Sequence, residues 1–109
     1  MRIVKVTKDH LIRVLLGKAS VPRGLYELAQ YFRIYDSINF QYHQEGEMTV
    51  ATSTNFHYGS IITHGRNSEE LDRNIKDAIL TSFEVPSSYT KEAKIVREGE
   101  ASKHAYALA

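Results

Sequence analysis

Apolar side chains recur at helical spacing twice within the first 35 residues. Thr7 can cap a helix and Gly17 can end it, because glycine readily takes the left-handed backbone conformation of a helix C-terminus. A second helix can begin at Ser20. The apolar stripes are Leu11, Ile12, Leu15 and Leu16 in the first helix, and Leu25, Leu28, Ala29 and Phe32 in the second. The pattern predicts a helix, a short turn and a helix over residues 8–35.

The apolar period then shortens to about 2 residues, which indicates strands. Ile38, Phe40 and Tyr42 alternate with polar residues, as in a half-buried strand. A turn at 44–47 and a Thr- and Val-rich segment at 48–54 complete a predicted β-hairpin. Residues 60–64 and 93–98 are predicted as a third and a fourth strand. The segment 101–109 shows no matching pattern, and we expect a tail or a short helix there.

A helix is predicted between the third and fourth strands. The run Asn67-Ser68-Glu69-Glu70 is a capping box, in which Asn67 accepts from an amide three residues on and Glu70 reaches back. The apolar stripe of this helix is Leu71, Ile75, Ala78, Ile79 and Phe83, and Pro86 bounds it.

These elements predict an α+β fold. We expect an N-terminal helical extension at 1–37, a β-β-β-α-β domain at 38–100 with one helix packed on the sheet, and a tail at 101–109. A chain of 109 residues is too short for two ordinary domains. Its 42% hydrophobic and 25% charged residues are typical of a globular protein.

The composition excludes several classes of protein. Cysteine is absent, which excludes a disulfide scaffold, a thiol nucleophile and a thiolate metal site, and favours a reducing compartment. The longest apolar run is Val14-Leu15-Leu16, far short of the roughly 20 residues of a membrane span. No signal-peptide pattern opens the chain, so we expect no membrane association and a cytoplasmic location.

No catalytic or metal-binding pattern emerges from the acids and histidines. A two-metal nuclease needs clustered carboxylates, and the strand at 38–43 contains none. His43 and His57 can approach each other across the hairpin, but the five histidines match no ligand spacing, and surface or turn positions explain them better. A phosphate-binding glycine loop and a nucleophile elbow are also absent. We therefore expect no enzyme activity, no metal and no cofactor.

Charge is distributed unevenly along the chain. Residues 1–37 hold seven Lys or Arg and three acids, which gives a net charge of +4. Residues 38–109 hold seven Lys or Arg and ten acids, which gives a net charge of −3. Lys18, Arg23 and Arg33 lie at or after the turn of the predicted N-terminal helices, where they can contact phosphates in a helix-turn-helix arrangement. The alternative is an ordinary helical hairpin that covers the sheet or builds an oligomer interface.

The order of elements from 38 to 98, together with the run from Ser60 to Leu71 and its continuation from Asn74 to Leu80, resembles the HicB-like antitoxin domain family. Gly65 ends the third strand, Asn67 caps the helix, and Glu70 and Leu71 occupy its first turn. Ile75 and Ala78 belong to the helix face that covers the sheet. The resemblance spans about 60 residues, and its combined motif is more specific than any part alone.

What the resemblance implies is a truncated ribonuclease-H-like fold without nuclease activity that forms homo-oligomers and binds a small HicA-type RNA-cleaving toxin. The expected function is that of an antitoxin, whose acidic part covers the toxin's basic RNA-binding surface. Two alternatives remain: a small DNA-binding transcriptional regulator that uses the N-terminal helices, and a stand-alone oligomeric domain of unknown function.

Overall fold

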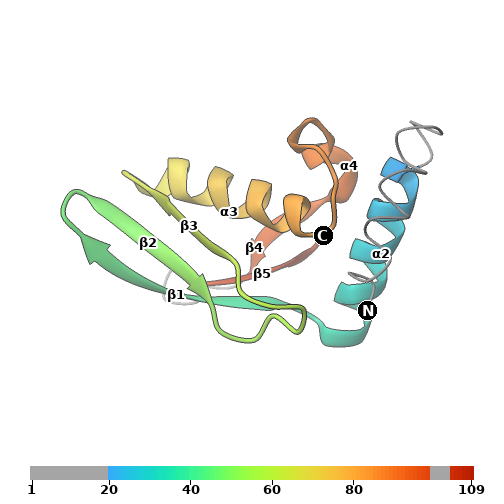
Figure 1. The fold of residues 1–109 in the computed structure, drawn as a ribbon, viewed down its shortest axis with the longest axis horizontal. Helices are drawn as coiled ribbons and strands as arrows, with labels where there is room; N and C mark the ends of the chain where they lie inside the picture. Colours follow the sequence, from blue (N-terminus) through green and yellow to red (C-terminus); the bar gives the residue numbers. More distant parts are fainter. Residues whose placement is uncertain (1–19, 99–103) are drawn as a thin grey trace.

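The structure is a computed structural model that describes residues 20–98 and 104–109. These residues form one antiparallel sheet with helices packed on it (Figure 1). The fold class is α+β, as predicted. The strand order across the sheet is β3-β2-β1-β5-β4. In chain order the elements are α2 (Ser20–Tyr35), β1 (Ile38–Glu45), β2 (Met48–Ser53), β3 (Ile62–Gly65), α3 (Ser68–Ser82), the 3-10 helix η2 (Ser87–Tyr89), α4 (Thr90–Ala93), β4 (Ile95–Glu98) and β5 (Ala105–Leu108).

Strands β1 and β2 form the hairpin that the alternating pattern predicts. Phe40 pairs with Ser53 and Tyr42 with Ala51. Gly46 turns the chain with a φ of 63°, a conformation that glycine adopts without a steric penalty. Strand β3 adds to the other side of β2, also antiparallel. The predicted β-hairpin and third strand are therefore confirmed.

Helix α3 begins at the predicted capping box. The Asn67 side chain accepts a hydrogen bond of 2.8 Å from the backbone amide of Glu70. The Glu70 carboxylate reaches back to the backbone amide of Arg66, at 3.0 Å, one residue further than a standard capping box reaches. The start of the helix lies very close to the end of β3. A Cβ atom at Gly65 would lie only 2.5 Å from the backbone nitrogen of Leu71, so glycine is required there.

Helix α2 lies at one end of the sheet, beside the C-terminal end of α3 (Figure 1). A Cβ atom at Gly24 would lie only 2.7 Å from the carbonyl oxygen of Phe83, so α2 and the segment after α3 make close backbone contact. One buried cluster unites the elements. Its members include Leu28, Tyr31 and Phe32 of α2, Ile38 and Phe40 of β1, Leu71, Ile75, Ile79 and Leu80 of α3, and Tyr106 of β5. The second predicted helix therefore shares its core with the sheet.

The prediction of a tail or short helix at 101–109 is wrong for residues 105–108, which form β5 in the interior of the sheet. Ile38 of β1 pairs with Tyr106 on one side, and Arg97 of β4 pairs with it on the other. The predicted order β-β-β-α-β is not matched, because η2 and α4 precede β4 and β5 follows it. A four-residue strand is too short to give a clear periodic signal in the sequence. Tyr106 and Ala107 of this strand are nevertheless both buried.

The predicted N-terminal hairpin is matched only in its second helix. The expected helix within 8–17 lies outside the described residues, whereas α2 begins at Ser20 as predicted. The fourth strand is shorter than predicted. Ala93 ends α4, and Lys94 takes a left-handed conformation before β4 starts at Ile95.

Candidate interaction surface

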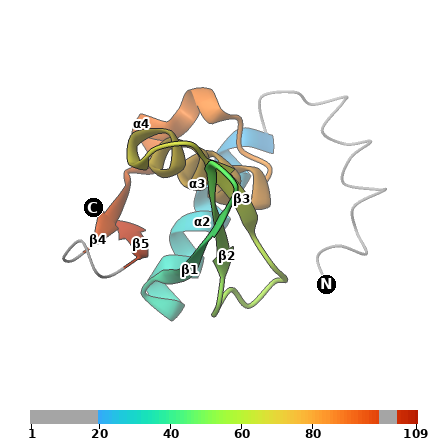
Figure 2. The same ribbon diagram turned by 90° about the vertical axis from the view of Figure 1, so that its left-hand side faces the viewer.

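The strand register assigns alternate residues to two faces of the sheet. Ile38, Phe40 and Tyr106 point to the side on which α3 packs. Figure 2, which views the sheet from the hairpin end, shows α3 and α4 together on one side of the strands. The positions on the other side form what we term the open face: Asn39, Gln41, His43, Glu45, Met48, Val50, Thr52, Ile62, His64, Val96, Glu98, Ala105 and Ala107.

The open face combines apolar and polar side chains and carries no Lys or Arg. Ile62 is 65% exposed and Val96 38% exposed, whereas Met48, Val50 and Thr52 are half-buried in the middle of the sheet. Glu45 and Glu98 are its acids, and none of its positions is Lys or Arg. Val96 shares its strand with Glu98, whereas Ile62 lies at the opposite edge of the sheet, opposite Thr52. The two exposed aliphatic side chains are therefore separate on the open face.

The histidines do not gather into one site. His43 Nε2 lies 3.0 Å from the carboxylate of Glu45, on the open face. His57, by contrast, stacks on Tyr35 with ring centroids 3.8 Å apart, beside α2. The suggested approach of His43 to His57 is therefore wrong, because the chain turns toward α2 after β2. In residues 20–98 and 104–109, no group of three or more His, Asp or Glu side chains is arranged to hold a metal ion.

Aromatic residues attach the segment between β2 and β3 to α2. The backbone amide of His57 donates a hydrogen bond of 2.9 Å to the Tyr31 hydroxyl. Burial raises the pKa of Tyr31, and this hydrogen bond partly offsets the rise because it favours the charged form. Tyr58 packs edge-on against Tyr31 yet is largely exposed. This segment is therefore anchored by buried rings and leaves one aromatic side chain accessible.

A partly buried polar cluster joins α3 to β5. The hydroxyl of fully buried Tyr106 donates a 2.6 Å hydrogen bond to the Asp72 carboxylate, which also pairs with Lys76 at 3.0 Å. Burial, assisted by the neighbouring Asp72, raises the pKa of Tyr106, and burial also raises that of Tyr42. Both hydroxyls therefore stay protonated near neutral pH. The hydrogen bond from Tyr106 to Asp72 ties β5 to α3.

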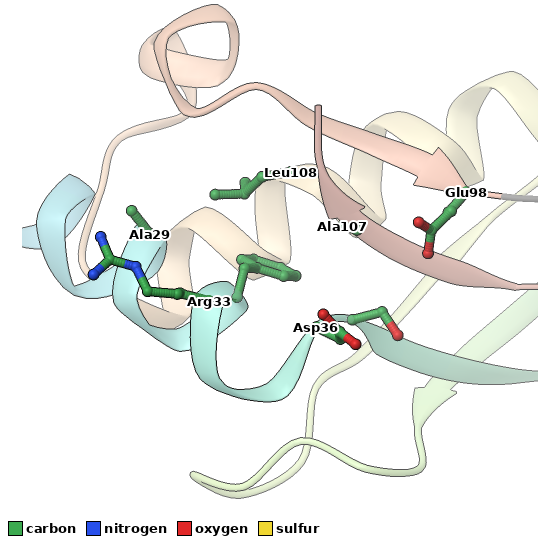
Figure 3. A pocket seen from close by; sticks show the side chains of 8 residues that line it. Ala29, Arg33, Asp36, Glu98, Ala107 and Leu108 are labelled. Carbon is green, nitrogen blue, oxygen red and sulfur yellow. The ribbon is translucent and has the colours of Figure 1, made fainter.

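A groove runs between α2 and the end of the open face. It has a volume of about 430 Å³ and is lined by Ala29, Phe32, Arg33, Asp36, Ser37, Glu98, Ala107 and Leu108. Figure 3 shows the Arg33 guanidinium toward one end and the Glu98 carboxylate toward the other, with Asp36 between them. Half of the lining residues are thus apolar, and two of the others, Asp36 and Glu98, are acids. We call it the α2–β5 groove.

The predicted phosphate-binding residues do not form a basic patch in the described part. Lys18 lies outside the described residues. Arg23 and Arg33 are both exposed on α2, but ten residues separate them by about 15 Å along the helix axis. Residues 20–37 also hold two acids, Glu27 and Asp36, so this segment carries no net charge. The positive surplus of residues 1–37 therefore comes entirely from residues 1–19.

The residues that carry the resemblance to the HicB-like family contribute to the packing and capping of the fold. Gly65 allows the close contact of β3 with α3, Asn67 caps α3, and Leu71 and Ile75 are buried in the core. Ala78 is half-buried and packs against the core. The acidic groove was not found from the sequence. The local signals are an acid directly after a predicted helix, Asp36, and an acid at the end of a predicted strand, Glu98.

Comparison with protein-family models, with curated proteins and with solved structures gives no significant match to this chain. The resemblance to the HicB-like family therefore stays a prediction. No helix among residues 20–98 and 104–109 is both long and apolar enough to cross a bilayer.

Proposed function

We propose that this protein is a non-enzymatic, HicB-like binding protein that acts as an antitoxin. The observation that carries the proposal is the open face, where exposed Ile62 and Val96 lie among polar and acidic side chains with no Lys or Arg. A sheet face of this composition that no helix of residues 20–98 and 104–109 packs over has the chemistry of a protein-binding surface.

The proposed mechanism is occlusion. A small RNA-cleaving toxin must present a basic surface in order to hold the phosphates of its substrate. The open face offers that surface acids and aliphatic side chains, which steer the encounter and then exclude water from the contact. The toxin's RNA site is blocked sterically, so the antitoxin itself needs no catalytic group.

The test is co-purification with the small basic protein encoded by the neighbouring gene, at modest salt, followed by an RNA-cleavage assay. We expect a complex in which cleavage is suppressed. The variant Gln41→Lys adds a positive charge to the open face, at an exposed position. It should weaken the complex about tenfold.

The matched control is Thr81→Lys, which adds the same charge at an exposed position of α3, away from the open face. It should leave the affinity within about twofold of the original value. Absence of a complex, or equal effects of the two substitutions, would show that the proposal is wrong.

The two alternatives predict different outcomes. A DNA-binding regulator would retain duplex DNA in a salt-sensitive manner and lose it on substitution of Lys18, Arg23 or Arg33. A stand-alone homo-oligomer would bind neither toxin nor DNA but would change its oligomeric state when the open face is altered. Light scattering on the same Gln41→Lys and Thr81→Lys pair distinguishes that case.

A further inference from the structure

Asp36 places a carboxylate directly after the C-terminus of α2. It takes the left-handed conformation, with a φ of 72°, and its amide donates to the carbonyl oxygen of Phe32 at 2.9 Å. Aspartate tolerates this conformation, and Glu84 and Lys94 adopt it after α3 and α4. A carboxylate at a helix C-terminus faces the negative end of the helix dipole, which adds to the negative potential there.

Glu98 supplies a second carboxylate to the same groove. The register pairs Glu98 with Ala105 and, further along β5, Val96 with Ala107, so the Glu98 side chain lies on the open face beside the Ala107 end of the groove. Neither Asp36 nor Glu98 makes a side-chain ion pair or hydrogen bond with any residue in the described part of the chain. The groove therefore holds two carboxylates that form no side-chain ion pair within the described residues, and its own cation, Arg33, lies toward the end opposite Glu98.

From this geometry we infer that the α2–β5 groove binds an arginine side chain presented by the basic partner, with its guanidinium at Asp36 and Glu98. The inference rests on the proposed function for the identity of the partner. The lining of Ala29, Phe32 and Leu108 can pack against the aliphatic stem of an arginine. The C-terminus of α2 adds its own partial negative charge beside the guanidinium.

Arginine fits the groove better than lysine. A planar guanidinium can donate to two carboxylates at once, whereas an ammonium group acts as a compact point charge that is more strongly hydrated. The guanidinium of Arg33, at the far end of the groove, repels a second cation (Figure 3). The incoming side chain is therefore directed toward Asp36 and Glu98.

A small probe tests the groove without the partner. N-acetyl-arginine methylamide is titrated into the ¹⁵N-labelled full-length protein, and amide shifts are followed by NMR. We expect saturable shifts at Asp36, Ser37, Glu98 and Ala107 with a dissociation constant of about 1–10 mM. The citrulline analogue has the same shape without the charge, and it should bind at least about tenfold more weakly. The lysine analogue should fall between the two.

Substitutions then assign the charge. Asp36→Asn keeps a residue that tolerates the left-handed conformation, so it should weaken arginine binding about tenfold without lowering the melting temperature. Glu98→Gln should weaken it similarly. Glu47→Gln is the matched control, because Glu47 is an exposed acid in the hairpin turn, outside the groove lining. It should leave the titration unchanged.

The inference is overturned if the arginine probe causes no saturable shift, if citrulline or lysine binds as well as arginine, or if Glu47→Gln has the effect of Asp36→Asn. These results are independent of the partner. A toxin complex that forms normally with Asp36→Asn would remove the groove from the interface and leave the antitoxin proposal intact. Arginine binding without any toxin complex would refute the antitoxin proposal alone.

Discussion

At the scale of single residues, the Tyr106 hydroxyl makes a partly buried hydrogen bond that joins the sheet to α3. Tyr106 is 0% exposed, and its hydroxyl donates to a carboxylate that also pairs with Lys76. Tyr106→Phe keeps the ring but removes the donor. We expect a loss of about 1–2 kcal/mol in the free energy of unfolding, measured by urea denaturation, because hydrogen bonds to charged groups are the stronger ones.

The control for this prediction is Tyr26→Phe. The Tyr26 hydroxyl accepts a hydrogen bond of 2.6 Å from Gln30, but the residue is 62% exposed and water can replace the contact. We expect a change below about 0.5 kcal/mol. If both substitutions had the same small effect, the hydrogen bond between Tyr106 and Asp72 would contribute nothing to stability.

Glu70 gives a pH-dependent prediction. The backbone amide of Arg66 donates to its carboxylate, and with the Arg66 guanidinium this holds the pKa of Glu70 below its ordinary value of 4.5. A lowered pKa in the folded state stabilises the fold above the unfolded value, and that contribution is lost as the pH falls through the folded value. The melting temperature should therefore fall less between about pH 6 and about pH 3 in Glu70→Gln than in the original protein.

Glu69→Gln is the matched control for the pH experiment. Glu69 is the adjacent acid in the first turn of α3, and in the described part of the chain its carboxylate accepts no hydrogen bond. Its substitution should leave the acid-induced loss of stability as it is in the original protein. An equal reduction in both variants would mean that the helix terminus as a whole, not the contact with Arg66, causes the pH dependence.

At the scale of elements, β5 is the part of the fold whose removal has the largest expected effect. It lies between β1 and β4, and both Tyr106 and Ala107 are buried. Deleting residues 105–109 exposes two strand edges and opens the core. We expect the cooperative thermal transition and the near-ultraviolet circular dichroism signal to disappear.

Deletion of Ala109 alone is the control for the truncation. This exposed residue contributes one backbone hydrogen bond of 2.8 Å, from its amide to the carbonyl oxygen of Lys94. The shortened protein should still unfold cooperatively, with a loss of about 1 kcal/mol or less. A protein lacking 105–109 that melted like the original would show that these residues are a tail after all.

Elements specified by neighbouring residues could be predicted from the sequence, and those specified by distant pairing could not. The cap of α3 depends on Asn67 and Glu70, three residues apart, and the β-hairpin depends on a local alternation. Strand β5 depends instead on the pairing of Tyr106 with Ile38, from the opposite end of the domain. No local pattern in Ala-Tyr-Ala-Leu indicates that pairing.

The candidate groove shows the same limit at the scale of the whole molecule. Asp36 follows a predicted helix, and Glu98 closes a predicted strand, so each acid was visible alone. Their shared groove arises only because β5 and β4 add to the side of β1. The net charge of residues 1–37 does not locate that charge either, because residues 20–37 carry no net charge and the positive surplus belongs to residues 1–19.

The two-sided sheet makes a final prediction, which adjacent isoleucines can test. Ile61 is 4% exposed and packs in the core, whereas Ile62 points out of the open face. Ile61→Ala should cost about 2–4 kcal/mol in the free energy of unfolding, because it leaves a cavity. Ile62→Ala should lower the free energy of unfolding by less than about 1 kcal/mol, because only the lower strand propensity of alanine acts at this exposed position. Equal costs in urea denaturation would mean that the open face is covered in solution, and a partner could not then dock there.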